Sequence, residues 1–101
     1  IEHKFWKHKI GEDYKARGFD VLIEEHVNGK PDIIAIGNNK RIAVEIETGN
    51  SEAIKNIEKN LKNGFDEIIC VAVSKEVEAK IRQELKIQDE KIKITSVFEF
   101  G

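Results

Sequence analysis

Two turn signals close together in the first half of the chain constrain its fold more than any other feature. Asn28-Gly29-Lys30-Pro31 and Gly37-Asn38-Asn39-Lys40 combine residue types that favour tight turns. Between them, residues 32–36 form a short run rich in isoleucine, which indicates a strand. Strands joined by such turns pair antiparallel. The sequence therefore predicts a meander of three strands, over residues 21–27, 32–36 and 41–48.

The third of these strands alternates strictly. Ile42, Val44 and Ile46 are separated by Arg41, Ala43, Glu45 and Glu47. Because successive side chains of a strand point to opposite faces, both glutamates are expected on the same face of the sheet.

The rest of the chain alternates helices with strands. The first helix is expected over residues 2–17, with Trp6, Ile10 and Tyr14 on its apolar face. The later segments are a helix between Ser51 and Gly64, a strand over residues 67–74, a helix over residues 75–85 and a strand over residues 91–100. The order α-β-β-β-α-β-α-β predicts an α/β fold, a mixed sheet with helices on its faces.

Length and composition set the class of protein. The 101 residues suffice for one domain and one core. The abundance of isoleucine, lysine and glutamate is typical of thermophilic proteins, although AT-rich genomes favour similar residues. No apolar run reaches the length of a membrane span or signal peptide, so a cytoplasmic location is expected. The chain contains no methionine, which leads us to expect a domain cut from a longer protein.

The overall charge does not indicate a protein that coats DNA. The net charge is -2 and the isoelectric point is near 6.0. This counts less against a nuclease, because its active site must collect carboxylates to hold metal ions. Contact with DNA would need a local basic patch. Lys55, Lys59 and Lys62 share one helical face and are candidates for it.

Three carboxylates are expected at one edge of the sheet. Asp32 begins the second strand, and Glu45 and Glu47 lie near the end of the third. Like charges held that close repel, and a bound divalent cation is the usual compensation. Mg²⁺ or Mn²⁺ held by Asp32, Glu45 and Glu47 would suit phosphodiester hydrolysis. The alternative is that both glutamates are solvated on the polar face of the strand.

The stretch PDIIAIGNNKRIAVEIETG resembles the core of the PD-(D/E)xK nucleases, and in particular archaeal Holliday-junction resolvases and Mrr-like restriction-endonuclease-like domains. Pro31-Asp32 matches their PD dipeptide, and Glu45 matches their acidic position. The expected order of elements agrees from Trp6 to Val97. The resemblance implies a single nuclease-like domain over residues 1–101.

The chain departs from that family at Glu47, where the catalytic lysine is expected. Some active restriction enzymes of this fold carry glutamate there. In other branches the lysine comes from the following helix, which makes Lys59, and after it Lys55, candidates; a solvated surface lysine is the alternative. Resolvases often add a glutamate from the first helix, but His3 or Lys7 occupies the matching place here.

The resemblance implies a metal-dependent DNA endonuclease. Asp32 and Glu45 would bind Mg²⁺ or Mn²⁺ with the backbone carbonyl of Ile46. Glu47 would be a further ligand or orient the attacking water, and Lys59 would stabilise the phosphate. The rival hypothesis is a nuclease-fold module that has lost cleavage and binds DNA or docks within a larger protein, such as an ATPase or helicase. The sequence leaves the DNA structure and the oligomeric state open; a homodimer is one option, because paired nicks usually need two sites.

Overall fold

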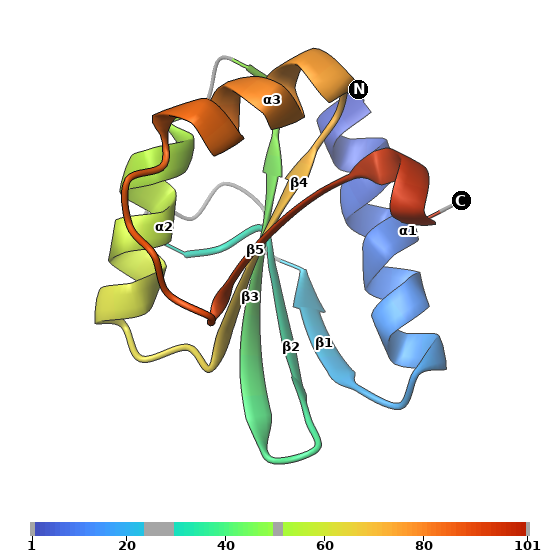
Figure 1. The fold of residues 1–101 in the computed structure, drawn as a ribbon. Coiled ribbons are helices and arrows are strands. Elements are labelled where there is room, and N and C mark those ends of the chain that lie inside the picture. The colour runs from blue at the N-terminus through green and yellow to red at the C-terminus, as the bar shows by residue number, and fades with distance from the viewer. Residues whose placement is uncertain (1, 24–29, 50–51, 101) are drawn as a thin grey trace.

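A computed structural model describes residues 2–23, 30–49 and 52–100 of the chain (Figure 1). Its centre is a five-stranded sheet in the order β1-β2-β3-β4-β5. The strands are β1 (Asp20–Ile23), β2 (Ile33–Gly37), β3 (Lys40–Glu47), β4 (Glu67–Ala72) and β5 (Ile92–Ser96). The helices are α1 (Glu2–Ala16), α2 (Ala53–Lys62), α3 (Lys75–Glu84) and the 3-10 turn η1 (Val97–Phe100).

The sheet is mixed, as the sequence predicts. β1, β2 and β3 form an antiparallel meander, and β4 and β5 run parallel to β3. The helices α2 and α3 provide the connections that parallel neighbours require. The α/β class and the order of the elements are thus confirmed.

The hairpin between β2 and β3 closes on two asparagines. Asn38 and Asn39 have φ values of 51° and 61°. Two successive residues with positive φ are the mark of a type I′ turn, whose twist matches that of the paired strands. The turn fixes the register Ile33 against Val44, and this register sets which residues meet at the far end of β3.

The two faces of β3 pack against different helices. Ile42, Val44 and Ile46 pack with Ile10 and Tyr14 of α1 in one apolar cluster. Ala43, on the opposite face, packs with Ile57 of α2, and with Phe65, Ile68 and Cys70, in a second cluster. Figure 1 shows α1 and η1 on one side of the sheet and α2 on the other. The two glutamates of β3 therefore face α2.

The expected last strand, over residues 91–100, is wrong at its end. The strand stops at Ser96, and residues 97–100 form η1. Val97 and Phe100 are three residues apart, a spacing that puts both on one side of a 3-10 turn, and both pack in the α1-side cluster. Burial of these two apolar side chains against α1 thus accompanies a break in the alternation of polar and apolar residues at Thr95-Ser96 and Val97-Phe98.

The expected first strand, over residues 21–27, lies partly outside the described residues, as do His26 and the Asn28-Gly29 step of its turn. Within the described ranges, no helix is long and apolar enough to cross a membrane. Cys70 is a free, buried thiol, as its apolar neighbours indicate.

Candidate functional site

Asp32 sits where the second strand is about to begin. Ile33 pairs with Val44, so the next position along the two strands sets Asp32 against Glu45. The Asp32 carboxylate is anchored by the backbone N–H of Ile46, which donates to Oδ2 at 2.8 Å. The side chain is 20% exposed. The short β2–β3 turn thus brings the first two predicted carboxylates together from opposite ends of neighbouring strands.

Glu45 and Glu47 are buried, with exposed fractions of 5% and 1%. The alternative of two solvated glutamates is therefore wrong for this structure, because α2 packs over the face that carries them. Each is met by an asparagine of that helix. Asn60 Nδ2 donates to Glu45 Oε2 at 3.0 Å, and Asn56 Nδ2 lies 3.5 Å from Glu47 Oε2.

Neither asparagine was identified from the sequence. One signal was present: Asn60 lies three residues after Ile57 and one before Leu61, a place at which the apolar stripe of α2 predicts an apolar residue. The structure shows Asn60 fully buried there. A polar residue on a buried helical stripe indicates a specific partner, here Glu45.

Burial dominates the electrostatics of Glu45. It raises the pKa of this carboxyl from 4.5 to about 7; the hydrogen bond from Asn60 lowers the pKa, the charges of Asp32 and Glu47 raise it, and Lys59 lowers it. The net result is a carboxyl that titrates near neutrality. Such a group gains from a nearby cation, because a positive charge favours its ionised form.

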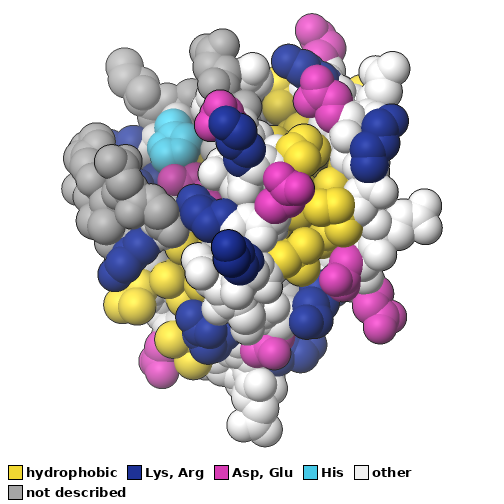
Figure 2. All heavy atoms as spheres, turned by 90° about the vertical axis from the view of Figure 1, so that its left-hand side faces the viewer, with side chains coloured by type: hydrophobic (Ala, Val, Ile, Leu, Met, Phe, Trp, Pro, Cys, Tyr) yellow, Lys and Arg dark blue, Asp and Glu magenta, His cyan; other side chains and the backbone are white. Residues whose placement is uncertain are grey.

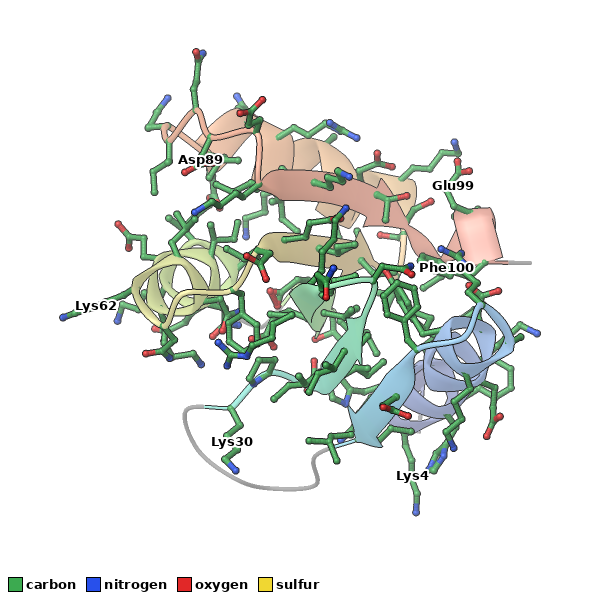
Figure 3. All side chains as sticks on the ribbon, turned by 90° about the horizontal axis from the view of Figure 1, so that it is seen from below. Lys4, Lys30, Lys62, Asp89, Glu99 and Phe100 are labelled. Carbon is green, nitrogen blue, oxygen red and sulfur yellow. The ribbon has the colours of Figure 1, made fainter. Side chains whose placement is uncertain are left out.

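Lys59 is the predicted cation that the structure brings to this site. It precedes Asn60 on α2, is half-buried, and its charge lowers the pKa of Glu45. Lys55 instead lies 3.3 Å from Glu52 and is 74% exposed. Lys62 extends outward from the last turn of α2 (Figure 3). The predicted basic strip on α2 therefore contains one lysine that acts on the carboxylates.

The first helix contributes a histidine. Nε2 of His3 lies 3.2 Å from Asp32 Oδ2, and its side chain is 41% exposed. Lys7, the other residue considered for this place, is buried. Glu12 lies on the outside, 3.6 Å from Lys15. Of the two residues considered for this place, His3 is therefore the one that lies beside Asp32, the predicted metal ligand.

The groups near Asp32 that could hold a cation are two carboxylates and a backbone carbonyl. In the described part of the chain, no three His, Cys, Asp or Glu side chains are close enough to hold a metal ion by themselves. Mg²⁺ is often bound through one or two carboxylates, with water and phosphate oxygens completing its shell. Asp32 and Glu45 fit that mode.

The Ile46 carbonyl is placed to join them. The N–H and C=O of one residue point to the same side of a strand, and the Ile46 N–H points towards Asp32. The Ile46 carbonyl is therefore expected on the Asp32 side of β3 as well.

The surface around α2 carries both signs of charge. Figure 2 shows that side of the molecule, with Lys and Arg side chains grouped around a histidine and neighbouring carboxylates. A mixed surface of this kind agrees with the net charge of -2.

Comparison with known proteins yields a likeness in fold. No family model matches the chain, and no curated protein matches it. A solved structure of a protein of unknown function, AF1548, is similar with a TM-score of 0.61 and 20% identity, over 92% of this chain. The match covers 57% of the AF1548 chain, so the present chain spans little more than half of that protein's length.

Proposed function

We propose that this chain is a metal-dependent DNA endonuclease domain that hydrolyses phosphodiester bonds. The observation that carries the proposal is that the half-buried Asp32, just before β2, lies close to the buried Glu45 of β3, and that the charge of Lys59 acts on the same Glu45 carboxyl. A fold that buries a carboxyl and raises its pKa to about 7 bears a cost that a bound cation removes. Perturbed carboxyls of this kind are typical of functional sites.

Each residue has a distinct role in this proposal. Asp32 and Glu45 hold Mg²⁺ or Mn²⁺, together with the carbonyl of Ile46. When bound there, such an ion would lower the pKa of a coordinated water and offset the negative charge of the phosphate. Lys59 approaches the same phosphate from α2 and stabilises the charge that develops on it. Glu47, held by Asn56, orients water or is a further ligand.

A module that binds DNA or docks without cutting is the second candidate. Two observations favour it: the residue in place of the family lysine, Glu47, is 1% exposed, and no cluster of three ligating side chains occurs in the described ranges. Such a module would keep the fold and need no metal. It would work within a longer protein, and that context is part of this second proposal.

Cleavage of labelled DNA separates the two candidates. The panel contains duplex, single-stranded and junction DNA with Mg²⁺ or Mn²⁺, and the variants are Asp32→Asn and Glu45→Gln. We expect both variants to lose roughly 100-fold or more in rate, because each removes a ligand charge. Glu58→Gln is the matched control, since Glu58 is exposed on the same helix as Lys59.

The opposite result is equally definite. A folded parent chain that neither cuts any DNA of the panel nor binds Mn²⁺ would exclude the endonuclease. DNA binding that is unchanged by EDTA would then support the module.

A further inference from the structure

Asn60 is the most deeply buried polar side chain of α2. Its exposed fraction is 0%, and its neighbours along the helical stripe, Ile57 and Leu61, pack in the α2-side apolar cluster. A leucine at this position would extend the stripe without interruption. The amide instead donates from Nδ2 to Glu45 Oε2 at 3.0 Å.

The other half of that amide is left without a partner. Asn60 Oδ1 is buried and has no hydrogen-bond partner among the described residues. A buried acceptor without a partner destabilises the folded state, so packing alone does not account for it. Oδ1 and Nδ2 share one carbon, which places the oxygen at the end of the side chain that meets Glu45. Buried acceptors of this kind are commonly completed by water or an ion.

The choice of an amide also preserves charge. A lysine or arginine hydrogen-bonded to Glu45 would neutralise it, whereas an asparagine orients the carboxylate and leaves its negative charge for another cation. Asn56 lies one turn earlier on the same face of α2 and meets Glu47 in the same way. The helix thus offers neutral donors to both glutamates of β3.

We propose that Asn60 is a positioning residue of the carboxylate centre: its Nδ2–H fixes the Glu45 carboxylate, and its Oδ1 accepts a hydrogen bond from a water bound to the cation that Asp32 and Glu45 hold. The inference rests on the metal site of the proposed function and not on DNA cleavage. Groups that orient metal ligands in this manner typically contribute 10- to 100-fold to affinity or activity.

Mn²⁺ titration calorimetry at pH 8 tests this role with two variants that act oppositely on packing. Asn60→Leu fills the site with apolar atoms, and Asn60→Ala leaves a cavity. In EDTA, we expect Asn60→Leu to melt at or above the parent temperature and Asn60→Ala below it. Both should nevertheless weaken Mn²⁺ binding by roughly 10- to 100-fold, because both lose the amide. Asn63→Leu, at the exposed end of α2, is the matched control and should bind like the parent.

The outcomes separate this inference from the proposed function. If both Asn60 variants bind Mn²⁺ as the parent does, the role of Asn60 is overturned. The same holds if Mn²⁺ affinity changes in parallel with the melting temperature. Neither result contradicts DNA cleavage by the parent. If the Asn60 variants bind Mn²⁺ more weakly than the parent, but the parent cuts no DNA, the positioning role of Asn60 is supported and the endonuclease proposal is excluded. A folded parent chain that binds no Mn²⁺ overturns both.

Discussion

Glu45 is an ionisable residue whose burial disfavours its charged form. Burial is the main reason that its pKa rises from 4.5 to about 7, and the charges of Asp32 and Glu47 add to the rise. Asn60 and Lys59 act in the other direction without cancelling it. In a metal-free chain, this residue therefore links stability to pH between weak acid and neutrality.

The sign of that link can be worked out. Between pH 4.5 and about 7 the folded chain retains a proton on Glu45 that the unfolded chain has released. The Glu45 contribution to the free energy of unfolding is therefore largest below pH 4.5, falls as pH rises through this window, and is level above it. A shift of this size corresponds to roughly 3 kcal/mol.

Glu45→Gln removes this dependence. In EDTA, the difference in free energy of unfolding between the variant and the parent should move in favour of the variant by up to about 3 kcal/mol from pH 4.5 to pH 8. Urea denaturation across that range measures it. Glu58→Gln, exposed on α2, should show a much smaller change. Parallel profiles for Glu45→Gln and the parent would contradict the raised pKa.

Lys59 provides a second prediction for single residues, within the proposed endonuclease. Lys59→Gln should lower kcat/KM for DNA cleavage by roughly 100-fold, because a charge next to the reacting phosphate is lost. Lys55→Gln should have little effect, since Lys55 is exposed and pairs with Glu52, and Lys59 is the lysine whose charge acts on Glu45. Equal losses in the two variants would indicate general attraction to DNA in place of a specific role.

These residues show which features of the candidate site could be predicted from the sequence. The alternation of β3 was enough to place Glu45 and Glu47 on one face, and the short turn was enough to bring Asp32 beside them. The burial of Glu45 and Glu47 was not predictable, because it depends on how α2 packs over β3 in the folded chain. The His3 contact with Asp32 also depends on tertiary packing, since the two lie 29 residues apart.

Among the elements, the β2–β3 hairpin and the end of β5 show one local signal that predicted the structure and one that was missed. Asn38 and Asn39 adopt positive φ, as the turn residues indicate. At the end of β5 the alternation of polar and apolar residues breaks, because two polar residues, Thr95 and Ser96, are followed by two apolar ones, Val97 and Phe98. There the apolar cluster beneath α1 decides the conformation.

The hairpin leads to a prediction about stability alone. Asn39→Gly creates the pair that type I′ turns prefer and should stabilise the chain by up to about 1 kcal/mol, because glycine adopts a φ of 61° without the steric cost of a side chain. Asn39→Val, with a branched side chain at a φ of 61°, should destabilise it by about 1–2 kcal/mol. Urea denaturation measures both. Neither change should alter Mn²⁺ affinity, because the turn is at the opposite end of β3 from Glu47.

At the scale of the whole molecule, the described residues around Asp32, Glu45 and Glu47 come from α1, from β3, from α2 and from the segment before β2. α1 supplies His3, the residue before β2 is Asp32, β3 supplies both glutamates, and α2 supplies the asparagines and Lys59. Figure 1 shows the β3 arrow pointing to the end of the sheet at which the N-terminus lies. A cation held there would connect segments from both faces of the sheet. Its binding should therefore stabilise the fold as a unit.

Mn²⁺ should accordingly raise the stability of the whole domain at pH 8. A ligand that binds only the folded state, at 100 times its dissociation constant, adds about 2.7 kcal/mol to the free energy of unfolding. The gain should shrink at pH 5.5, because protons compete with the cation for a carboxyl whose pKa is about 7. Thermal denaturation with Mn²⁺ or EDTA at the two pH values measures both effects. Asp32→Asn should lose most of the gain and Glu58→Gln should keep it. An equal gain in all three proteins would place Mn²⁺ elsewhere on the surface, and no gain in the parent would favour the module that binds no metal.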